Sequence, residues 1–239
     1  MQSELFIALA DDLDQLIRLH DREVDEASWH ALQEAAFPIG LALPPVDELG
    51  ELAYANMAAA LNAGVTLDLL AADYAAIYLT NAYSASPYES VWLSDDHLAC
   101  APPMFELREL YAESGLQVAD WRSRFDDHVV LQLQYLRHLM TNAAVHAPKM
   151  ANFIDEHLGY WFPDFASRVV MQCDTAFYAA LMELTQVWLT NFRQLLDEMF
   201  DLPVPKRNEV AARINRKLAL EKAEVAPIRF MPGVQGPSW

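Results

Sequence analysis

Histidine and acidic side chains are the residues of this chain that could bind a metal ion or transfer protons. The sequence has seven histidines and 34 acidic residues. A di-iron helical bundle needs Glu-x-x-His on two of its helices, but no histidine here has an acidic residue three positions before it. H-E-x-x-H, a glycine-rich phosphate loop and G-x-S-x-G are also missing. We therefore predict no catalytic residues, no metal site and no cofactor, and a metal-dependent helical-bundle enzyme is the least favoured function. The residues at those positions are Ile17, Ala27, Ser94, Phe125, Tyr135, Ala143 and Ile154.

A second stretch with chemically useful side chains lies between residues 70 and 93. Its first half has the 3, 4 and 7 spacing of a one-faced helix that carries Asp73 and Tyr78, and Pro87 prevents the helix from continuing. We predict a loop after Pro87, and this loop carries Tyr88 and Trp92. A short loop rarely has this much apolar surface unless it packs on something. It either caps one end of a core or lines a peptide-binding groove.

Asp126-Asp127-His128 repeats the triplet found at residues 95–97. Aspartate is a good N-cap because its carboxylate accepts a hydrogen bond from a free backbone N–H of the first helical turn. The sequence therefore predicts that Asp126 or Asp127 caps a helix over residues 129–144. Apart from this structural role, the triplet could belong to a binding site.

Three motifs together resemble one protein family. They are Asp73-Tyr74-Ala75-Ala76-Ile77-Tyr78 at a helix end, Pro87-Tyr88-Glu89-Ser90-Val91-Trp92-Leu93 in the following loop, and Asp127-His128 at a later helix start. This combination resembles the TorD/DmsD/NarJ family of cytoplasmic chaperones, and the resemblance covers roughly residues 5–200. Phe125 and Asp126 depart from it, because the family commonly has proline and a small or acidic residue there. The resemblance implies an all-helical protein that serves the maturation of molybdenum-cofactor oxidoreductases.

The resemblance also implies a partner and a site. The partner would be the catalytic subunit of a molybdenum oxidoreductase, with its twin-arginine leader peptide. Two guanidinium groups followed by an apolar stretch would need carboxylates for bidentate pairing beside an aromatic-lined groove. An assembly scaffold that binds the core subunit without recognising a leader is the alternative function. The candidate peptide-binding residues are Asp73, Tyr74, Ile77, Tyr78, Pro87, Tyr88, Glu89, Trp92, Asp126, Asp127 and His128.

The elements that must position these residues are predicted to be helices. Only seven glycines occur among 239 residues, and long stretches are rich in alanine and leucine. We predict an all-α bundle of two subdomains joined by a hinge, with its most strongly helical segment at residues 175–200. The predicted divisions are an N-terminal subdomain at residues 1–116, a hinge at 117–128, a C-terminal subdomain at 129–202 and a basic extension at 203–239.

Charge and cysteine content limit the partners and the compartment. The net charge is −18, which repels nucleic acid and anionic lipid and attracts cationic partners. Cys100 and Cys173 are isolated, and neither a signal peptide nor an apolar run long enough to span a membrane is evident. We expect a cytoplasmic protein without membrane insertion, and either a monomer or a dimer that exchanges halves through the hinge.

The C-terminal segment is charged differently from the rest. Residues 203–239 contain seven of the 16 basic residues but only three of the 34 acidic ones. A helix is predicted at residues 207–223, with too few apolar positions for a broad buried face. It could be solvated, or it could dock weakly on the acidic body and compete with a client's leader from a high effective concentration.

Overall fold

The structure is a computed structural model that describes residues 2–94 and 96–224. All regular elements in these ranges are helical, and an isolated β-bridge joins Tyr88 to His128. The predicted all-α class is therefore confirmed. The elements are α1 (Gln2–Asp21), α2 (Glu26–Glu34), α3 (Glu48–Leu61), α4 (Leu67–Tyr74), the π-helix η1 (Ala75–Leu79), α5 (Glu89–Leu93), α6 (Pro102–Glu113), α7 (Val129–Leu139), the 3-10 turn η2 (Met140–Asn142), α8 (Ala143–Phe153), the π-helix η3 (Ile154–Leu158), α9 (Gly159–Gln172), α10 (Ala176–Phe200) and α11 (Arg207–Glu224).

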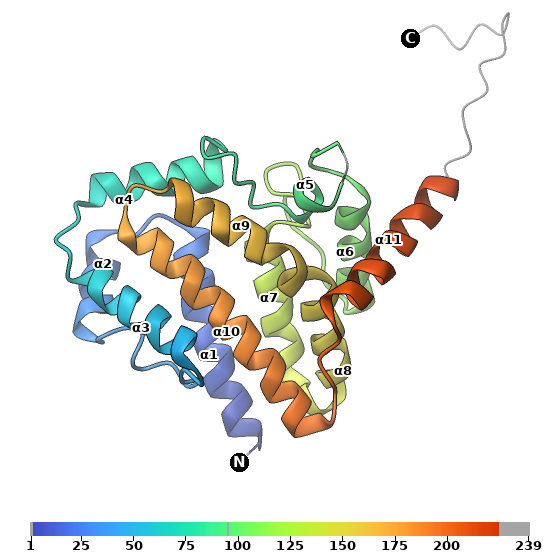
Figure 1. Ribbon diagram of the computed structural model, residues 1–239, viewed down its shortest axis with the longest axis horizontal. Coiled ribbons are helices and arrows are strands. Elements are labelled where there is room, and N and C mark those ends of the chain that lie inside the picture. The colour runs from blue at the N-terminus through green and yellow to red at the C-terminus, as the bar shows by residue number, and fades with distance from the viewer. Residues whose placement is uncertain (1, 95, 225–239) are drawn as a thin grey trace, which may run out of the picture.

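Helix α10 organises the bundle. It packs against α3 and α9, while α1 packs against α7, so helices from the two halves of the sequence lie side by side (Figure 1). The buried hydrophobic side chains form one cluster that extends from Phe6 in α1 to Leu196 in α10. The predicted subdomains and hinge remain a prediction, since in this structure both halves contribute to the same core.

The composition of α10 explains its central place. Its rings include Trp188, which stacks on Phe192 with 5.1 Å between ring centroids, and Phe192 in turn meets the edge of Phe6 at 6.2 Å. Burying one large apolar side chain contributes roughly 1.5–3 kcal/mol. The helix begins after Thr175 and ends where Asp201 adopts a left-handed conformation with φ of 53°. The prediction for residues 175–200 therefore agrees closely with the structure.

The sequence predicts that Asp11, Asp12 and Asp14 of the first helix face water, but for Asp12 this is wrong. Its side chain is only 2% exposed. The carboxylate accepts hydrogen bonds from the backbone N–H groups of Ala42 and Leu43 at 2.8 and 3.0 Å, and from the indole Nε1 of Trp188 at 3.1 Å. Burial raises the pKa of Asp12, although these hydrogen bonds offset part of the effect. Asp12 therefore ties the loop before α3 to the core.

Several helix boundaries differ from the predictions. The sequence predicts a helix at about residues 46–62, opened by Pro44-Pro45, and α3 begins slightly later, after its N-cap Asp47. The segment after Pro87 is not all loop, because it contains the short helix α5. The helix predicted over residues 129–144 changes to a 3-10 turn at Met140. The sequence also predicts that Pro148 starts a helix, but Pro148 lies inside α8. An interior proline removes a single backbone hydrogen bond, which the packing of α8 in the core tolerates.

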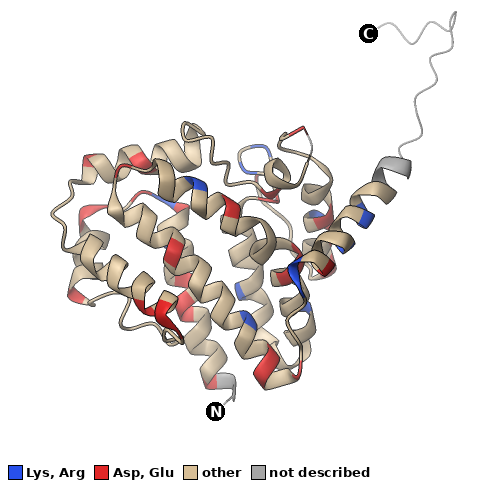
Figure 2. Ribbon diagram, viewed as in Figure 1, with Lys and Arg blue, Asp and Glu red and all other residues tan. Residues whose placement is uncertain are grey.

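Helix α11 extends away from the bundle at its C-terminal end (Figure 1). Its lysines and arginines lie near acidic residues of the body, whereas acidic side chains predominate elsewhere (Figure 2). Residues 225–239, the end of the predicted basic extension, lie outside the described residues. Among the described residues, no helix has both the length and the apolar character needed to cross a membrane.

Candidate functional site

The second and third sequence motifs meet where residues 86–90 run beside residues 126–129, a contact that we call the junction. The backbone N–H of Val129 donates to the carbonyl of Pro87 at 2.9 Å, and the N–H of Glu89 donates to the carbonyl of Asp127 at 3.2 Å. These bonds form the isolated bridge between Tyr88 and His128. Backbone pairing therefore fixes the position of both motifs.

The hydrogen bonds of Asp127 and His128 differ from those that the sequence predicts. The N-cap of α7 is His128, whose Nδ1 accepts from the backbone N–H of Val130 at 3.1 Å, so the prediction that Asp126 or Asp127 caps this helix is wrong. Asp127 instead accepts from the backbone N–H of Ser90 at 2.9 Å, in the first turn of α5. Both side chains are at least 98% buried. Burial raises the pKa of Asp127 and lowers that of His128.

Asp126 is paired already within the protein. Its Oδ2 lies 2.7 Å from Nη2 of Arg108 in α6, and its backbone carbonyl accepts from the hydroxyl of Tyr111 at 2.9 Å. Asp126 is nearly fully buried, whereas the Arg108 side chain is 40% exposed. The arginine also lies over the rings of Phe105 and Trp121, at 5.6 and 5.3 Å. A cation from outside would therefore compete with Arg108 for this carboxylate.

Asp73 lies away from the junction and caps the N-terminus of α10. Its carboxylate accepts from the backbone N–H groups of Asp174 and Thr175 at 3.1 and 2.8 Å, and from the Thr175 hydroxyl at 2.6 Å. It also accepts from the hydroxyl of Tyr83. The Asp73 side chain is 1% exposed. It therefore supplies the negative charge that a helix N-terminus favours, from a position about a hundred residues earlier in the chain.

Tyr74, Ile77 and Tyr78 are also buried. The hydroxyl of Tyr74 donates to the carbonyl of Asp21 at 2.7 Å, and the hydroxyl of Tyr78 lies 2.6 Å from Nδ1 of His20. The other ring nitrogen of His20 lies 2.9 Å from the Thr185 hydroxyl. Burial lowers the pKa of His20 to about 3, so this imidazole is neutral. These side chains connect α1, η1 and α10 and have little surface to offer a ligand.

Glu89 forms a buried polar cluster with residues that sequence reasoning missed. Its two carboxylate oxygens lie 2.9 Å from Nδ1 of His157 and 2.9 Å from Nε2 of Gln132. The amide oxygen of Gln132 accepts from the indole of Trp161 at 3.2 Å. Burial raises the pKa of Glu89. Burial alone would lower the pKa of His157, but the neighbouring Glu89 carboxylate stabilises the charged imidazole, and the pKa of His157 is raised overall. The carboxylate therefore favours the protonated form of the imidazole.

Pro87, Tyr88 and Trp92 complete the set of candidate residues. Pro87 is buried, whereas Tyr88 and Trp92 remain partly exposed. Tyr88 lies between the rings of Phe125 and His128, at 5.7 and 5.0 Å. The indole Nε1 of Trp92 donates to the carbonyl of Ser86 at 2.8 Å, which fixes the ring. The structure thus brings the motifs of residues 87–92 and 126–128 together, and it buries all candidates except these two aromatic residues.

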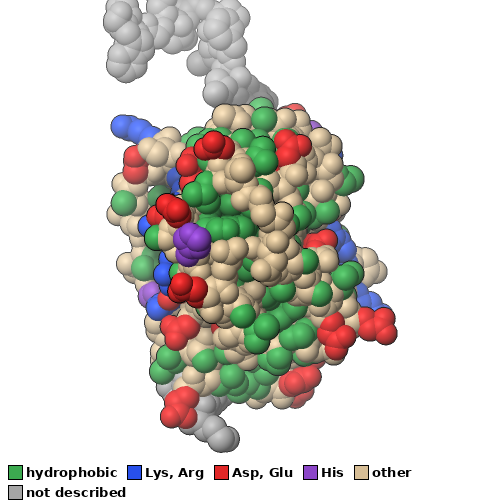
Figure 3. Space-filling view, turned by 90° about the vertical axis from the view of Figure 1, so that its left-hand side faces the viewer, with side chains coloured by type: hydrophobic (Ala, Val, Ile, Leu, Met, Phe, Trp, Pro, Cys, Tyr) green, Lys and Arg blue, Asp and Glu red, His purple; other side chains and the backbone are tan. Residues whose placement is uncertain are grey.

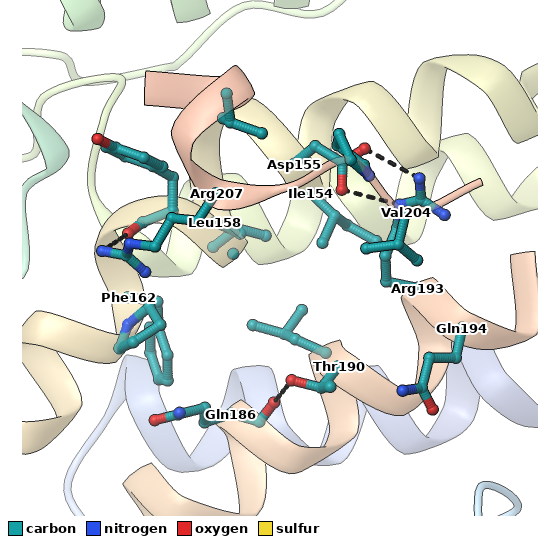
Figure 4. Close-up of a pocket in the computed structure, with 16 residues that line it drawn as sticks. Ile154, Asp155, Leu158, Phe162, Gln186, Thr190, Arg193, Gln194, Val204 and Arg207 are labelled. Atoms are coloured by element: carbon teal, nitrogen blue, oxygen red, sulfur yellow. Dashed lines mark hydrogen bonds and ion pairs between the residues drawn. The ribbon is translucent and has the colours of Figure 1, made fainter. Parts of the chain in front are cut away.

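A separate cavity of about 280 Å³ lies between η3, α9, α10 and residues 204–210, away from the predicted residues (Figure 4). Asp155 and Arg193 face each other on its border in a bidentate pair, with N–O distances of 2.9 and 3.0 Å. Arg193 also donates to the carbonyls of Leu202 and Pro203 at 2.8 and 3.1 Å. This pair therefore holds the start of the C-terminal segment against α10. No group of acidic, histidine and cysteine side chains among the described residues could hold a metal ion.

Comparisons with known proteins agree with this helical architecture. A family model described as nitrate reductase delta subunit matches residues 44–167. The chaperone protein TorD of Shewanella oneidensis is 34% identical over 144 residues, which cover 56% of this chain and 64% of the relative. TorD of Vibrio cholerae is 31% identical over 141 residues, covering 55% and 64%. TorD of Shewanella piezotolerans is 30% identical over 187 residues, covering 74% and 86%.

The protein is an all-helical bundle, and its relatives are named for a chaperone rather than for a catalytic activity, in agreement with the prediction that it is not an enzyme. The chain belongs to the nitrate reductase delta subunit family, the TorD/NarJ type of chaperone. It spans just under two thirds of the length of the first two relatives, 64% of each.

Proposed function

We propose that this protein is a cytoplasmic chaperone for a molybdenum-cofactor oxidoreductase. It binds the twin-arginine leader and the apo form of the catalytic subunit, and it holds the subunit for cofactor insertion before export or assembly. Family membership and the TorD relatives support this proposal. The structural observation that carries it is the partly exposed aromatic pair, Tyr88 and Trp92, held beside acidic side chains at the junction.

The surroundings of this pair suit the two parts of a leader. Both rings are fixed by neighbours, so little side-chain entropy is lost when an apolar segment packs on them. Asp126 is paired with an arginine that is itself 40% exposed, and an incoming guanidinium can replace that partner without leaving the carboxylate unpaired. Bidentate pairing would favour arginine over lysine in this position. Glu89, Asp127 and His128 are buried and make the hydrogen bonds that hold the junction in place.

A second surface is suited to the body of the client. Hydrophobic side chains are exposed among acidic ones on the side of the molecule where α2, α3 and α4 lie (Figure 3). Leu49, Leu52 and Leu69 on α3 and α4 are at least 50% exposed. Extended apolar surface rimmed by polar groups commonly marks a site of protein interaction. We propose that this surface binds apolar regions that the apo enzyme exposes.

Truncation of Trp92 tests the leader site. Aromatic anchors cost about 2 kcal/mol or more when truncated at an interface, so Trp92→Ala should weaken binding of a twin-arginine leader peptide about thirtyfold. The control is Val145→Ala, because Val145 is 67% exposed and lies in α8, outside the junction. Peptide affinity is measured by calorimetry and folding by circular dichroism. Equal affinities for both folded variants and the unchanged protein would contradict the leader site.

Capture of the client separates the proposed function from the scaffold alternative. The apo catalytic subunit is offered to the immobilised protein with its leader, without its leader, and with both arginines replaced by lysine. We expect capture to weaken when the leader is removed and to weaken partly after the lysine replacements. Equal capture in all three cases would instead support an assembly scaffold that binds only the core subunit.

A further inference from the structure

Helix α11 lies in a groove that is lined by both acidic and apolar side chains. Val210, Ile214 and Leu218 follow one another at intervals of four residues, and the first two are only 4% and 7% exposed. Leu218 reaches the groove itself. The sequence predicts too few apolar positions for a broad buried face, and the face that docks is a single narrow stripe. The groove, which we call the α11 groove, is formed by Glu89, Leu93, Pro103, Glu106, Glu156 and His157.

The basic side chains of α11 are directed at the carboxylates of this groove. Nζ of Lys217 lies 2.6 Å from Oε1 of Glu106 and 2.6 Å from Oε2 of Glu156. Nη1 of Arg213, one turn earlier, lies 3.0 Å from Oε1 of Glu156. Glu156 is 13% exposed, so these pairs are less screened by water than ordinary surface pairs. The α11 groove thus accepts two cations one helical turn apart, next to an apolar stripe.

The groove continues into the polar cluster at the junction. Glu106, which receives Lys217, lies 4.0 Å from Nε2 of His157, and Nδ1 of the same imidazole lies 2.9 Å from Glu89. The junction residue Glu89 lines the groove directly. A cation in the α11 groove is therefore only two side chains away from the candidate site residue Glu89.

The way α11 is attached allows it to leave the groove without unfolding the body. Residues 202–206 have no regular structure, and their start is fixed by the hydrogen bonds from Arg193 to the carbonyls of Leu202 and Pro203. On the outer side of α11, Arg216 is exposed and Leu220 is 61% exposed. The helix is therefore a tethered segment that docks along one face, and a segment on a short tether competes at a millimolar effective concentration.

We propose that the α11 groove is the docking site for the basic, amphipathic segment of the client's leader, and that α11 occupies it as a built-in competitor. This inference rests on the proposed function and places part of the leader in a defined groove. The leader enters when α11 leaves, with one of its arginines taking the place of Lys217 and its apolar residues those of Ile214 and Leu218. The C-terminal segment thereby sets the affinity threshold for a client.

Charge reversal within α11 tests this inference in the full-length chain. Lys217→Glu places a third carboxylate against Glu106 and Glu156 and should release α11. Arg216→Glu is the matched control, because it makes the same charge change on the exposed side of the same helix. Hydrogen exchange of residues 207–220 reports the release. If α11 is docked in about nine of ten molecules, Lys217→Glu should bind a twin-arginine leader peptide about tenfold more tightly than Arg216→Glu.

Each outcome decides the inference. Adding Glu106→Gln to Lys217→Glu should weaken leader binding again, because it removes a carboxylate of the groove, and this loss would support the inference. Equal leader affinity of Lys217→Glu and Arg216→Glu, with exchange data showing that α11 is released, would overturn it and leave the proposed function intact. Absence of leader binding by every variant would overturn both. A wild-type dimer that Lys217→Glu converts to a monomer would assign the groove to α11 of a second copy and overturn the inference.

Discussion

Asp73 offers a direct test of whether the first sequence motif is structural. The motif implies a ligand-binding carboxylate, whereas the structure places the side chain under the N-terminus of α10 with 1% of its surface exposed. It accepts hydrogen bonds from the backbone of Asp174 and from both the backbone and the hydroxyl of Thr175. Thr175 itself makes no side-chain capping bond. Asp73→Ala therefore removes the acceptor for the backbone N–H groups at the start of α10, which is the longest helix among the described residues.

The expected loss of stability follows from these contacts. Losing an N-cap costs about 1–2 kcal/mol, and a hydrogen bond to a charged acceptor contributes roughly 1.5–3 kcal/mol. Because bonds to one carboxylate are not additive, we expect a loss of about 3 kcal/mol in the free energy of unfolding. An unfolding entropy of about 2.1 cal/mol/K per residue, applied to 239 residues, gives about 0.5 kcal/mol/K. The melting temperature should therefore fall by about 6 °C.

Calorimetry and leader-peptide titration together decide between the two roles of Asp73. Asp68→Ala is the matched control, because Asp68 lies in the same helix and is exposed; it should change the melting temperature by less than about 2 °C. Asp73→Ala should bind leader peptide normally at temperatures well below its own transition. An unchanged melting temperature combined with lost peptide binding would refute the structural role that we assign to Asp73.

Two further predictions concern stability. Acid should destabilise the protein through His20. This side chain is neutral in the folded state, because its pKa is about 3 there against 6.5 for the free side chain. Its contribution to the free energy of unfolding is therefore present above pH 6.5 and is lost as the pH falls towards 3. The loss is about 1.4 kcal/mol at about pH 5.5, and urea titrations of His20→Gln should show a correspondingly weaker acid dependence than those of the unchanged protein. Arg193→Met leaves the Asp155 carboxylate, 8% exposed, without its partner and should cost roughly 3–5 kcal/mol. Urea unfolding measures this loss, with the exposed Arg168→Met as control; equal midpoints for the two variants would contradict it.

The helical architecture was predictable because it depends on local patterns. Apolar spacing, few glycines and the turn signals locate most helices, and α10 differs from the predicted 175–200 by one residue at its start. The signals fail where tertiary packing overrides propensity. Pro148 is tolerated inside α8, and residues 75–79 widen into a π-helix that no spacing rule indicates.

The candidate site was predictable only as a set of residues, without their partners. The motifs identify Glu89, but nothing near it in the sequence points to His157 or Gln132, which lie 68 and 43 residues away. The sequence also does not reveal which carboxylates already accept hydrogen bonds within the protein. Asp73 accepts a hydrogen bond from the backbone N–H of Thr175 at the start of α10, and Asp127 accepts one from the backbone N–H of Ser90 in α5. Both donors are distant in the sequence.

The burial of the motifs changes how their substitution should be interpreted. A variant of Asp127 or Glu89 disturbs the hydrogen bonds that hold α5 against residues 127–132, so we expect it to move Trp92 as well. Lost leader binding in such a variant would not show that the substituted side chain touches the leader. Trp92 and Lys217 are better probes, since each is partly exposed and neither belongs to the buried hydrogen-bond network. Because Glu89 contributes to both the junction and the α11 groove, a leader long enough to contact both would bind an aromatic anchor on one side of this buried residue and a pair of carboxylates on the other.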